Sequence, residues 1–356
     1  MVKILDRALL EGNDIIKKIK NFEELRAALV DLERLVEMRE AKTSVMLQLK
    51  YLLSGRKDKN DMLHTVIYGP PGVGKTQLGK ILSRFYYALG LLTPGKKEED
   101  NQLKKIYDTL LPTLFVLERS NEEEVRDEAN ILGNLLAGII PQTFEKQEGK
   151  LVVVSRVDFV AEFCGASALK TKRLLEDNIG NVLFIDEAYS LVFGDRDSFG
   201  MEALTTLNLF MSERPKDIIV IFAGYKDMLE NSIFKYQPGL KRRCTWTFNI
   251  EPYSADGLCK IFKEQLRREG MCVEDDVNLS LWFKERVKDF PGFGGDTQRL
   301  LFYCKLYSVE DIFNNMGKRK RNDDVISGRV LDISFNCLKN NTIQEKEKDA
   351  PMGMYI

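Results

Sequence analysis

The stretch Gly69-Pro70-Pro71-Gly72-Val73-Gly74-Lys75-Thr76 decides the fold of this chain. It follows a short apolar run, His64 to Tyr68, that predicts a β-strand, and it opens a helical pattern that continues to about Gly90. Glycines allow backbone N–H groups to turn inward around a phosphate, and the N-terminus of the helix adds a favourable dipole. Lys75 is expected to reach the β- and γ-phosphates of a nucleotide, and Thr76 to bind Mg²⁺. The stretch therefore predicts a nucleotide-binding loop, with a purely structural glycine turn as the alternative.

A second apolar run, Val182 to Ile185, ends in the acidic pair Asp186-Glu187. On a strand adjoining the glycine-rich loop, Asp186 can hold Mg²⁺ through water, and Glu187 can orient and deprotonate an attacking water. Alone this pattern is weak, because acidic residues at the N-terminus of a helix look the same. Together with the loop, it predicts a magnesium-dependent site that binds and hydrolyses ATP, with the Lys75 amine near both carboxyl groups.

A further apolar run, 151–154, is expected to resume the sheet, and another, 218–222, is, like 182–185, typical of a parallel strand that is covered on both faces. Helical patterns separate these runs from one another and from the first two strands. Residues 61–251 are therefore predicted to form an α/β domain in which helices sandwich a parallel sheet.

The remaining chain is predicted to be largely helical. Residues 1–60 are expected to form an N-terminal helical segment and a linker, because leucines recur there at helical spacing. The interval between the glycine-rich loop and the acidic pair is far longer than one β-α-β unit needs, so a helical insertion is expected at about 95–149.

After Pro252 the patterns indicate helices only, and residues 252–316 are predicted to form a small all-helical domain. Residues 317–356 are predicted to be a basic linker, a short helix and a tail. The basic run at 318–321 is expected to be part of a solvated linker, and a nuclear-import signal or phosphate-binding patch is the alternative.

The charge of the chain is nearly balanced, with 53 Lys and Arg residues against 54 Asp and Glu residues. No net field therefore draws it to nucleic acid or to an anionic membrane. No apolar run reaches the roughly 18 residues of a membrane-spanning helix, and the first residues lack the features of a secretion signal. Six cysteines without a C-x-x-C pair argue against a zinc site or a disulfide framework, and they suit a reducing compartment. The single histidine, His64, excludes a two-histidine metal site and is expected at the surface or a strand edge.

Several stretches resemble the AAA+ ATPases, and most closely the branch of stage V sporulation protein K and the red-type Rubisco activase. The resemblance covers about 32–91 and 150–307. Beside the glycine-rich loop, the stretches that carry it are Gly180-Asn181-Val182-Leu183-Phe184-Ile185-Asp186-Glu187-Ala188-Tyr189-Ser190-Leu191, Asp197-Ser198-Phe199-Gly200 and Ala223-Gly224-Tyr225. The resemblance implies a P-loop NTPase fold of the AAA+ type, followed by a small all-helical lid domain. The ending, 351–355, is similar to that of relatives in large DNA viruses.

The resemblance also implies roles for residues outside the two motifs. The segment Gln237 to Arg243 is similar to the one that ends in the family's arginine finger, so Arg243 is the expected finger and Arg242 its companion. Such a finger places a fixed guanidinium at the γ-phosphate of the neighbouring subunit. Arg299 matches the family's sensor arginine, with a salt bridge between lid and core as the alternative. For Arg242 and Arg243, the alternative interpretation is that both are ordinary surface residues.

A further segment, Phe163-Cys164-Gly165, resembles the first pore loop of the family. There an aromatic side chain grips an extended polypeptide, because it offers apolar area at little rotamer cost. The residues predicted to bind ATP are thus Gly69, Pro70, Pro71, Gly72, Val73, Gly74, Lys75, Thr76, Asp186 and Arg299. Thr76 and Asp186 are the expected Mg²⁺ ligands, and Glu187, Arg243 and Arg242 the expected catalytic residues.

The resemblance favours an ATP-hydrolysing motor that forms a homo-oligomeric ring, expected to be a hexamer, and remodels or threads a protein substrate. A nucleic-acid-directed relative, such as a clamp loader or a helicase-related motor, shares the same nucleotide residues and is the first alternative. A nucleotide-gated assembly scaffold is the second. Neither nucleic acid nor membrane is an expected partner. The expected location is intracellular and cytoplasmic. For a viral protein, it is the cytoplasm or nucleus of the host cell.

Overall fold

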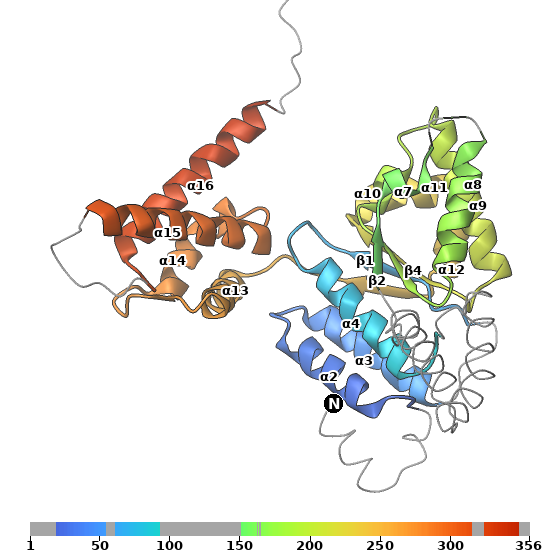
Figure 1. Ribbon diagram of the computed structural model, residues 1–356, viewed down its shortest axis with the longest axis horizontal. Helices are drawn as coiled ribbons and strands as arrows, with labels where there is room; N and C mark the ends of the chain where they lie inside the picture. Colours follow the sequence, from blue (N-terminus) through green and yellow to red (C-terminus); the bar gives the residue numbers. More distant parts are fainter. Residues whose placement is uncertain are drawn as a thin grey trace, which may run out of the picture.

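Five parallel strands form the central sheet, in the order β2-β3-β4-β1-β5 (Figure 1). The strands are β1 (Thr65–Tyr68), β2 (Leu151–Val154), β3 (Val182–Ile185), β4 (Ile219–Gly224) and β5 (Trp246–Asn249). Pairing of Tyr68 with Gly224, and of Ile185 with Phe222, brings the carboxyl ends of β1, β4 and β3 to one edge. The expectation that β1 and β3 adjoin is wrong, because β4 lies between them. The parallel sheet itself is confirmed.

The computed structural model describes residues 19–54, 61–92, 151–161, 163, 165–314 and 324–348. The insertion predicted at about 95–149, the basic run at 318–321 and Cys164 lie outside these residues.

Helices cover both faces of the sheet, because β1, β3 and β4 are apolar and buried along their whole length. On one face, Val182 and Phe184 of β3 join the core formed by α2 (Phe22–Arg34), α3 (Arg39–Ser54) and α4 (Lys75–Ala88). On the other face, Leu183 and Ile185 join a second core with α8 (Ala166–Asp177) and α9 (Ser198–Glu213). The alternation of side chains along a strand thus divides one apolar run between two cores.

Short elements connect the strands to these helices on the second face. They are α7 (Arg156–Phe159), η2 (Ala188–Leu191), α10 (Lys226–Asn231), α11 (Ile233–Tyr236) and α12 (Pro238–Arg243). Figure 1 shows α7, α10 and α11 at the same end of the sheet. The loops that follow β2, β3 and β4 therefore lie at the edge where nucleotide sites of open α/β sheets are found.

The C-terminal helices form a lid beside the sheet (Figure 1). They are α13 (Ala255–Arg268), α14 (Leu279–Arg286), η3 (Val287–Asp289), α15 (Gly294–Asn314) and α16 (Gly328–Lys348). Aromatic side chains fill the centre of the lid, where Trp282 makes edge contacts with Phe283 and Phe335. Such pairs combine a large buried area with specific geometry, and these rings belong to the same hydrophobic core as α2, α3 and α4.

The lid differs from the sequence expectation in two ways. The region after Pro252 is not helical throughout, because β6 (Cys272–Val273) pairs in parallel with β7 (Val325–Ile326). The short helix expected near the C-terminus is the 21-residue α16, which packs along α15. Its apolar side chains recur at helical spacing, and Leu331 and Leu338 are buried.

His64 is fully buried, which corrects the expectation of a surface or strand-edge position. Its Nδ1 atom accepts a hydrogen bond of 3.1 Å from the backbone N–H of Val220 at the start of β4. Burial lowers the pKa of His64 to about 4, and the charge of Arg243 acts in the same direction. The histidine is therefore a neutral polar link inside the second core.

No helix within the described residues combines the length and the apolarity that a bilayer crossing requires.

Candidate nucleotide-binding site

The glycine-rich loop connects the buried end of β1 to the first turn of α4. Gly72 and Gly74 have φ angles of +71° and +90°, which glycine adopts without steric cost. The N–H of Gly69 donates to Gly224 at the end of β4, with a distance of 3.1 Å. The loop is thereby fixed to the central strand of the site, with the N-terminus of α4 facing the same edge of the sheet.

Lys75 lies between the loop and the acidic pair. Its Nζ atom donates to the carbonyls of Gly69 and Pro70, at 3.1 and 2.8 Å. Burial lowers the pKa of Lys75, and the charges of Asp186 and Glu187 partly offset this effect. The charges of both carboxylates therefore act on the amine, although β4 separates their strands.

The backbone directs the two carboxylates differently. The N–H of Asp186 donates to Val154 at the end of β2, and Asp186 Oδ1 accepts the N–H of Glu187 at 3.0 Å. Glu187 itself has a left-handed backbone, with φ at +46°, and an exposed side chain. Such a conformation costs about 1–3 kcal/mol in a non-glycine residue, and strain of this kind is concentrated at functional sites. The turn presents the Glu187 carboxylate to solvent while Asp186 stays half-buried.

The oxygen atoms at this edge fit a magnesium ion. Thr76 contributes a half-buried hydroxyl on the first turn of α4, and Asp186 contributes a carboxylate after β3. Mg²⁺ prefers oxygen ligands and is usually held by only one or two protein groups, with phosphates and water completing the shell. A hydroxyl and one half-buried carboxylate beside the phosphate-binding loop meet that requirement.

Tyr225 is a further residue of this site, and no role was predicted for it. It directly follows β4, and its ring centroid is 6.0 Å from Lys75 Nζ and 6.3 Å from the ring of Tyr189. Burial raises the pKa of Tyr189, and a hydrogen bond with Glu187 adds to this effect. Two phenols thus flank the amine and the acidic pair. The stretch 223–225 was visible in the sequence, but only the strand order places Tyr225 between the two motifs.

The lid contacts the loop directly. The Tyr253 hydroxyl donates to the Val73 carbonyl at 2.9 Å, and the N–H of Gly294 donates to the Gly72 carbonyl at 3.1 Å. A Cβ atom on Gly72 would lie 1.9 Å from the carbonyl oxygen of Gly292. Glycine at position 72 therefore permits both the positive φ of the turn and the close contact with the lid.

The turn between α2 and α3 closes the same side of the loop. Glu37 and Met38 both have positive φ angles, of 54° and 50°. Glu37 accepts a hydrogen bond of 3.0 Å from the N–H of Ser254, and a Cβ atom on Gly74 would lie 2.8 Å from the end of Met38. No local pattern marks these residues, because their position depends on contacts with the loop and the lid.

Arg299 lies on the lid side of the site. It follows the start of α15, whose first residue is hydrogen-bonded to the loop, and it lines an open pocket of about 320 Å³ with Phe302 and Tyr303. Its role as a sensor arginine stays a prediction.

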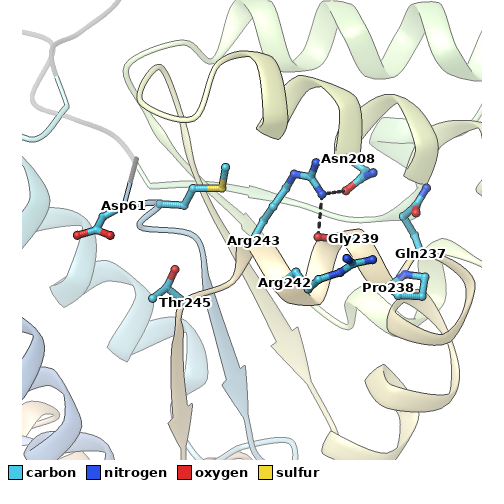
Figure 2. Close-up of a pocket in the computed structure, with 9 residues that line it drawn as sticks. Asp61, Asn208, Gln237, Pro238, Gly239, Arg242, Arg243 and Thr245 are labelled. Atoms are coloured by element: carbon cyan, nitrogen blue, oxygen red, sulfur yellow. Dashed lines mark hydrogen bonds between the residues drawn. The ribbon is translucent and has the colours of Figure 1, made fainter. Parts of the chain in front are cut away.

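The two arginines of α12 lie apart from the glycine-rich loop. Arg242 is exposed, whereas Arg243 is half-buried and hydrogen-bonded to α9. Both line an open pocket of about 600 Å³ (Figure 2). Among the residues that the structure describes, neither guanidinium bonds to Lys75 or to the acidic pair, which is compatible with a role toward a neighbouring subunit.

Phe163 is 75% exposed in the loop between α7 and α8. Gly165 follows with φ at +80° and nothing within 4 Å of a Cβ atom placed on it. The N–H of Ala161 donates to Ser167 Oγ at 3.1 Å, which ties the base of the loop to α8. Phe163 is therefore not a core residue.

The strand order, the loop at the start of α4 and a helical lid against that loop define an AAA+ ATPase. The crystal structure of the FIGL-1 AAA domain in complex with ADP has the same fold, with a TM-score of 0.50, 13% identity, and coverage of 88% of this chain and 89% of that one. No family model matches the chain.

Sequence relatives identify the branch. A CfxQ homolog of Pyropia yezoensis is 34% identical over 202 residues, which are 56% of this chain and 67% of that protein. A putative cfxQ-like protein of Acanthamoeba polyphaga mimivirus is 29% identical over 302 residues, 83% of this chain and 61% of that protein. Stage V sporulation protein K of Bacillus subtilis is 25% identical over 286 residues, with 80% and 70% covered. The chain therefore belongs to the CfxQ-like family of AAA+ ATPases.

The chain spans 61% of the mimivirus relative's length. The resemblance to a protein of a large DNA virus, expected from the sequence, is confirmed by this relative.

Proposed function

We propose that the chain is the subunit of a homo-oligomeric ring that uses ATP hydrolysis to remodel a protein substrate. The observation that carries this proposal is the Lys75 amine held against the glycine-rich loop at the start of α4, with the charges of both carboxylates of the acidic pair acting on it. A pair of acids beside a phosphate-binding amine is the arrangement needed for metal-assisted hydrolysis of a triphosphate.

In the hydrolysis step, the Glu187 carboxylate takes a proton from a water molecule as that water adds to the γ-phosphorus. The bond from this phosphorus to the bridging oxygen breaks, and the products are ADP and inorganic phosphate. Lys75 and the N–H groups of the loop stabilise the charge on the phosphate oxygens. Thr76 and Asp186 would hold Mg²⁺, which, when bound, neutralises charge on the β- and γ-phosphates.

The substrate-binding part of the proposal is supported by the loop at Phe163. An aromatic side chain that is 75% exposed on a loop tied down at its base offers an apolar contact independent of substrate sequence. The names of the relatives include a Rubisco activase and a sporulation protein, so relatives within the branch serve different processes. We propose a polypeptide as the substrate class, an intracellular location, and host-cell cytoplasm or nucleus for a viral chain.

The Glu187→Gln variant tests this function. The amide cannot accept the water proton, so ATP hydrolysis should fall at least about 100-fold, the typical contribution of a general base. Binding of ATP should persist, because Lys75 and the loop are unchanged. Measurements are steady-state phosphate release, and binding of a fluorescent ATP analogue.

The Lys226→Ala variant, which removes an exposed charge at the start of α10, serves as the control. Normal phosphate release by Glu187→Gln would overturn the assignment of the base. In the trapped ATP-bound state, a substrate polypeptide should copurify with Glu187→Gln and not with Lys75→Ala. Equal recovery with both variants would contradict remodelling driven by ATP.

A further inference from the structure

The turn that connects α2 to α3 has an unusual backbone. Glu37 and Met38 are consecutive residues in the left-handed region, with φ angles of 54° and 50°. That region favours glycine and is costly for a residue with a Cβ atom. Such a conformation persists only where the surrounding contacts hold it. The contacts of these two side chains therefore explain the form of the turn.

On one side, the turn is fixed to the core. Lys42 Nζ donates to the carbonyls of Leu35 and of Glu33, the second at 3.1 Å, and so satisfies acceptors at the end of α2. Met38 is buried, and a Cβ atom on Gly74 would lie 2.8 Å from its terminal methyl group. The turn is thereby held against the glycine-rich loop.

On the other side, Glu37 reaches the lid. One of its carboxylate oxygens accepts the N–H of Ser254 at 3.0 Å, and the other accepts the hydroxyl of the same serine. Ser254 is the N-cap of α13, and its Oγ also accepts the N–H of Gly257 at 3.1 Å. The N-terminus of a helix favours a negative charge. Glu37 therefore joins the first helix of the lid to a turn of the core.

Gly257 leaves room for this carboxylate. It lies in the first turn of α13, and its backbone is not left-handed, so the helix itself does not call for glycine. A Cβ atom there would lie 2.7 Å from the carboxyl carbon of Glu37. A larger residue at position 257 would therefore push the carboxylate away from Ser254.

The contact lies beside the groups through which the lid meets the glycine-rich loop. Tyr253 directly precedes Ser254, and its hydroxyl donates to the Val73 carbonyl at 2.9 Å. Burial raises the pKa of Tyr253 to about 12, and the charge of Glu37 acts in the same direction. The second contact comes from Gly294 at the start of α15, a helix that packs on α13. A displacement of α13 would therefore disturb both contacts.

We propose that Glu37 is a positioning residue whose carboxylate holds α13, and with it the lid, against the glycine-rich loop, so that the site binds ATP tightly. The apparent affinity of a site falls when its binding-competent arrangement is less populated. The inference rests on the proposed function, because it concerns the affinity of the same site for ATP, and it adds a residue that acts on that affinity from outside the site.

The first test is Glu37→Gly, because glycine relieves the left-handed backbone while it deletes the carboxylate. The melting temperature should therefore stay the same or rise. The KM for ATP, and the Kd of a fluorescent ATP analogue, should rise about tenfold, as expected for lost hydrogen bonds to a charged group. The kcat at saturating ATP should be unchanged, which is the signature of lost binding. A merely structural role would instead lower the melting temperature and leave the KM unchanged.

Two further variants bracket this result. Glu37→Gln keeps one acceptor oxygen for Ser254, so its KM should lie between those of Glu37→Gly and the unmodified chain. Glu40→Ala is the matched control, because it removes a carboxylate from the first turn of α3 that bonds to Asn249 of β5 instead of the lid. Its KM should be unchanged.

The second test keeps Glu37 and displaces its carboxylate. In Gly257→Ala the new Cβ atom would occupy the place of the carboxylate, while alanine favours the helix. The KM should rise as it does in Glu37→Gly, with α13 still folded. In the double variant the KM should rise no further, because both changes remove the same contact.

Hydrogen exchange reports the position of the lid without turnover or nucleotide. The N–H of Gly294 bonds to the carbonyl of Gly72 while the lid lies against the loop. A peptide that contains Gly294 should therefore exchange faster in Glu37→Gly than in the unmodified chain. A peptide that contains Trp282, in the centre of the lid, should exchange at the same rate in both.

Three results would overturn the inference. They are an unchanged KM in Glu37→Gly, additive increases of the KM in the double variant, and unchanged exchange at Gly294. If one of them occurs while Glu187→Gln is inactive in the same assay, the proposed function still stands and only the role of Glu37 fails. If Glu187→Gln hydrolyses ATP normally, the proposed function itself fails.

Discussion

At the residue scale, the chemistry-bearing groups divide into those that a local pattern identifies and those that only the fold assembles. Lys75, Thr76, Asp186 and Glu187 were predicted because a loop or strand directly presents each of them. Tyr225 was not assigned, because its proximity to Lys75 arises from the position of β4 between two other strands. The order of the strands in the sheet cannot be predicted from a local stretch of sequence.

His64 gives the clearest prediction at this scale. Burial lowers its pKa in the folded chain to about 4, against an ordinary value of 6.5. The unfolded chain therefore binds a proton as pH falls below 6.5, whereas the folded chain does so only near 4. The contribution to stability is complete above pH 6.5 and is lost progressively as pH falls toward 4. Between pH 7 and pH 5 the free energy of unfolding should fall by about 2 kcal/mol from this residue alone.

Urea denaturation at these two pH values measures the effect. His64→Asn is the matched variant, because its amide oxygen can accept the Val220 N–H and it does not titrate. Since the chain has a single histidine, the variant should lose most of the pH dependence in this range. An unchanged difference between pH 7 and pH 5 in His64→Asn would show that other groups cause it.

At the element scale, continuous apolar runs were sufficient to predict β1, β2, β3 and β4, whereas β5 was missed. Only Phe248 of its four residues is buried, and Thr247 and Asn249 are polar, so no apolar run marks it. β6 and β7 have two residues each, too few for any periodicity. These short strands form because a neighbouring strand is available for pairing, and this depends on the tertiary structure.

The packing of α4 on β3 yields a prediction for Gly79. A Cβ atom there would lie 2.6 Å from the buried ring of Phe184. Overpacking of this kind costs about 1–3 kcal/mol, and the better helix propensity of alanine returns about 1 kcal/mol at most. Gly79→Ala should therefore lower the free energy of unfolding. Lys80→Ala, at an exposed position of the same helix, should not.

Urea midpoints of the two variants provide the comparison. Equal midpoints would mean that α4 can move away from Phe184 without loss of packing. A lower midpoint together with weaker ATP binding would show that α4 also sets the position of the loop at its N-terminus.

At the scale of the whole molecule, the family resemblance predicted a helical lid, and the structure shows how it meets the core. The contacts from Tyr253 and Gly294 to the glycine-rich loop, and from Glu37 to Ser254, join segments far apart in the sequence. None of these contacts has a sequence signature. The nucleotide site was therefore predictable in its phosphate-binding part and not in the part formed by the lid and the α2–α3 turn.

Assembly into a ring gives the prediction at this scale. If a guanidinium of one subunit completes the site of the next, phosphate release per subunit should rise with protein concentration and level off when assembly is complete. Light scattering on the same samples reports particle mass. A specific activity that stays constant while dilution reduces the particle mass would contradict catalysis across a subunit interface.

The bond between the N–H of Gly294 and the carbonyl of Gly72 is made by backbone atoms on both sides. Every amino acid except proline brings the same two atoms, so no replacement of a side chain elsewhere in the lid deletes this bond. This hydrogen bond therefore persists when side chains on the lid surface change. An insertion or deletion in the turn before α15 would break it, because the N–H donor would move away from the carbonyl. A chain that keeps this turn at the same length can therefore change the side chains on the lid surface while the link to the phosphate-binding loop persists.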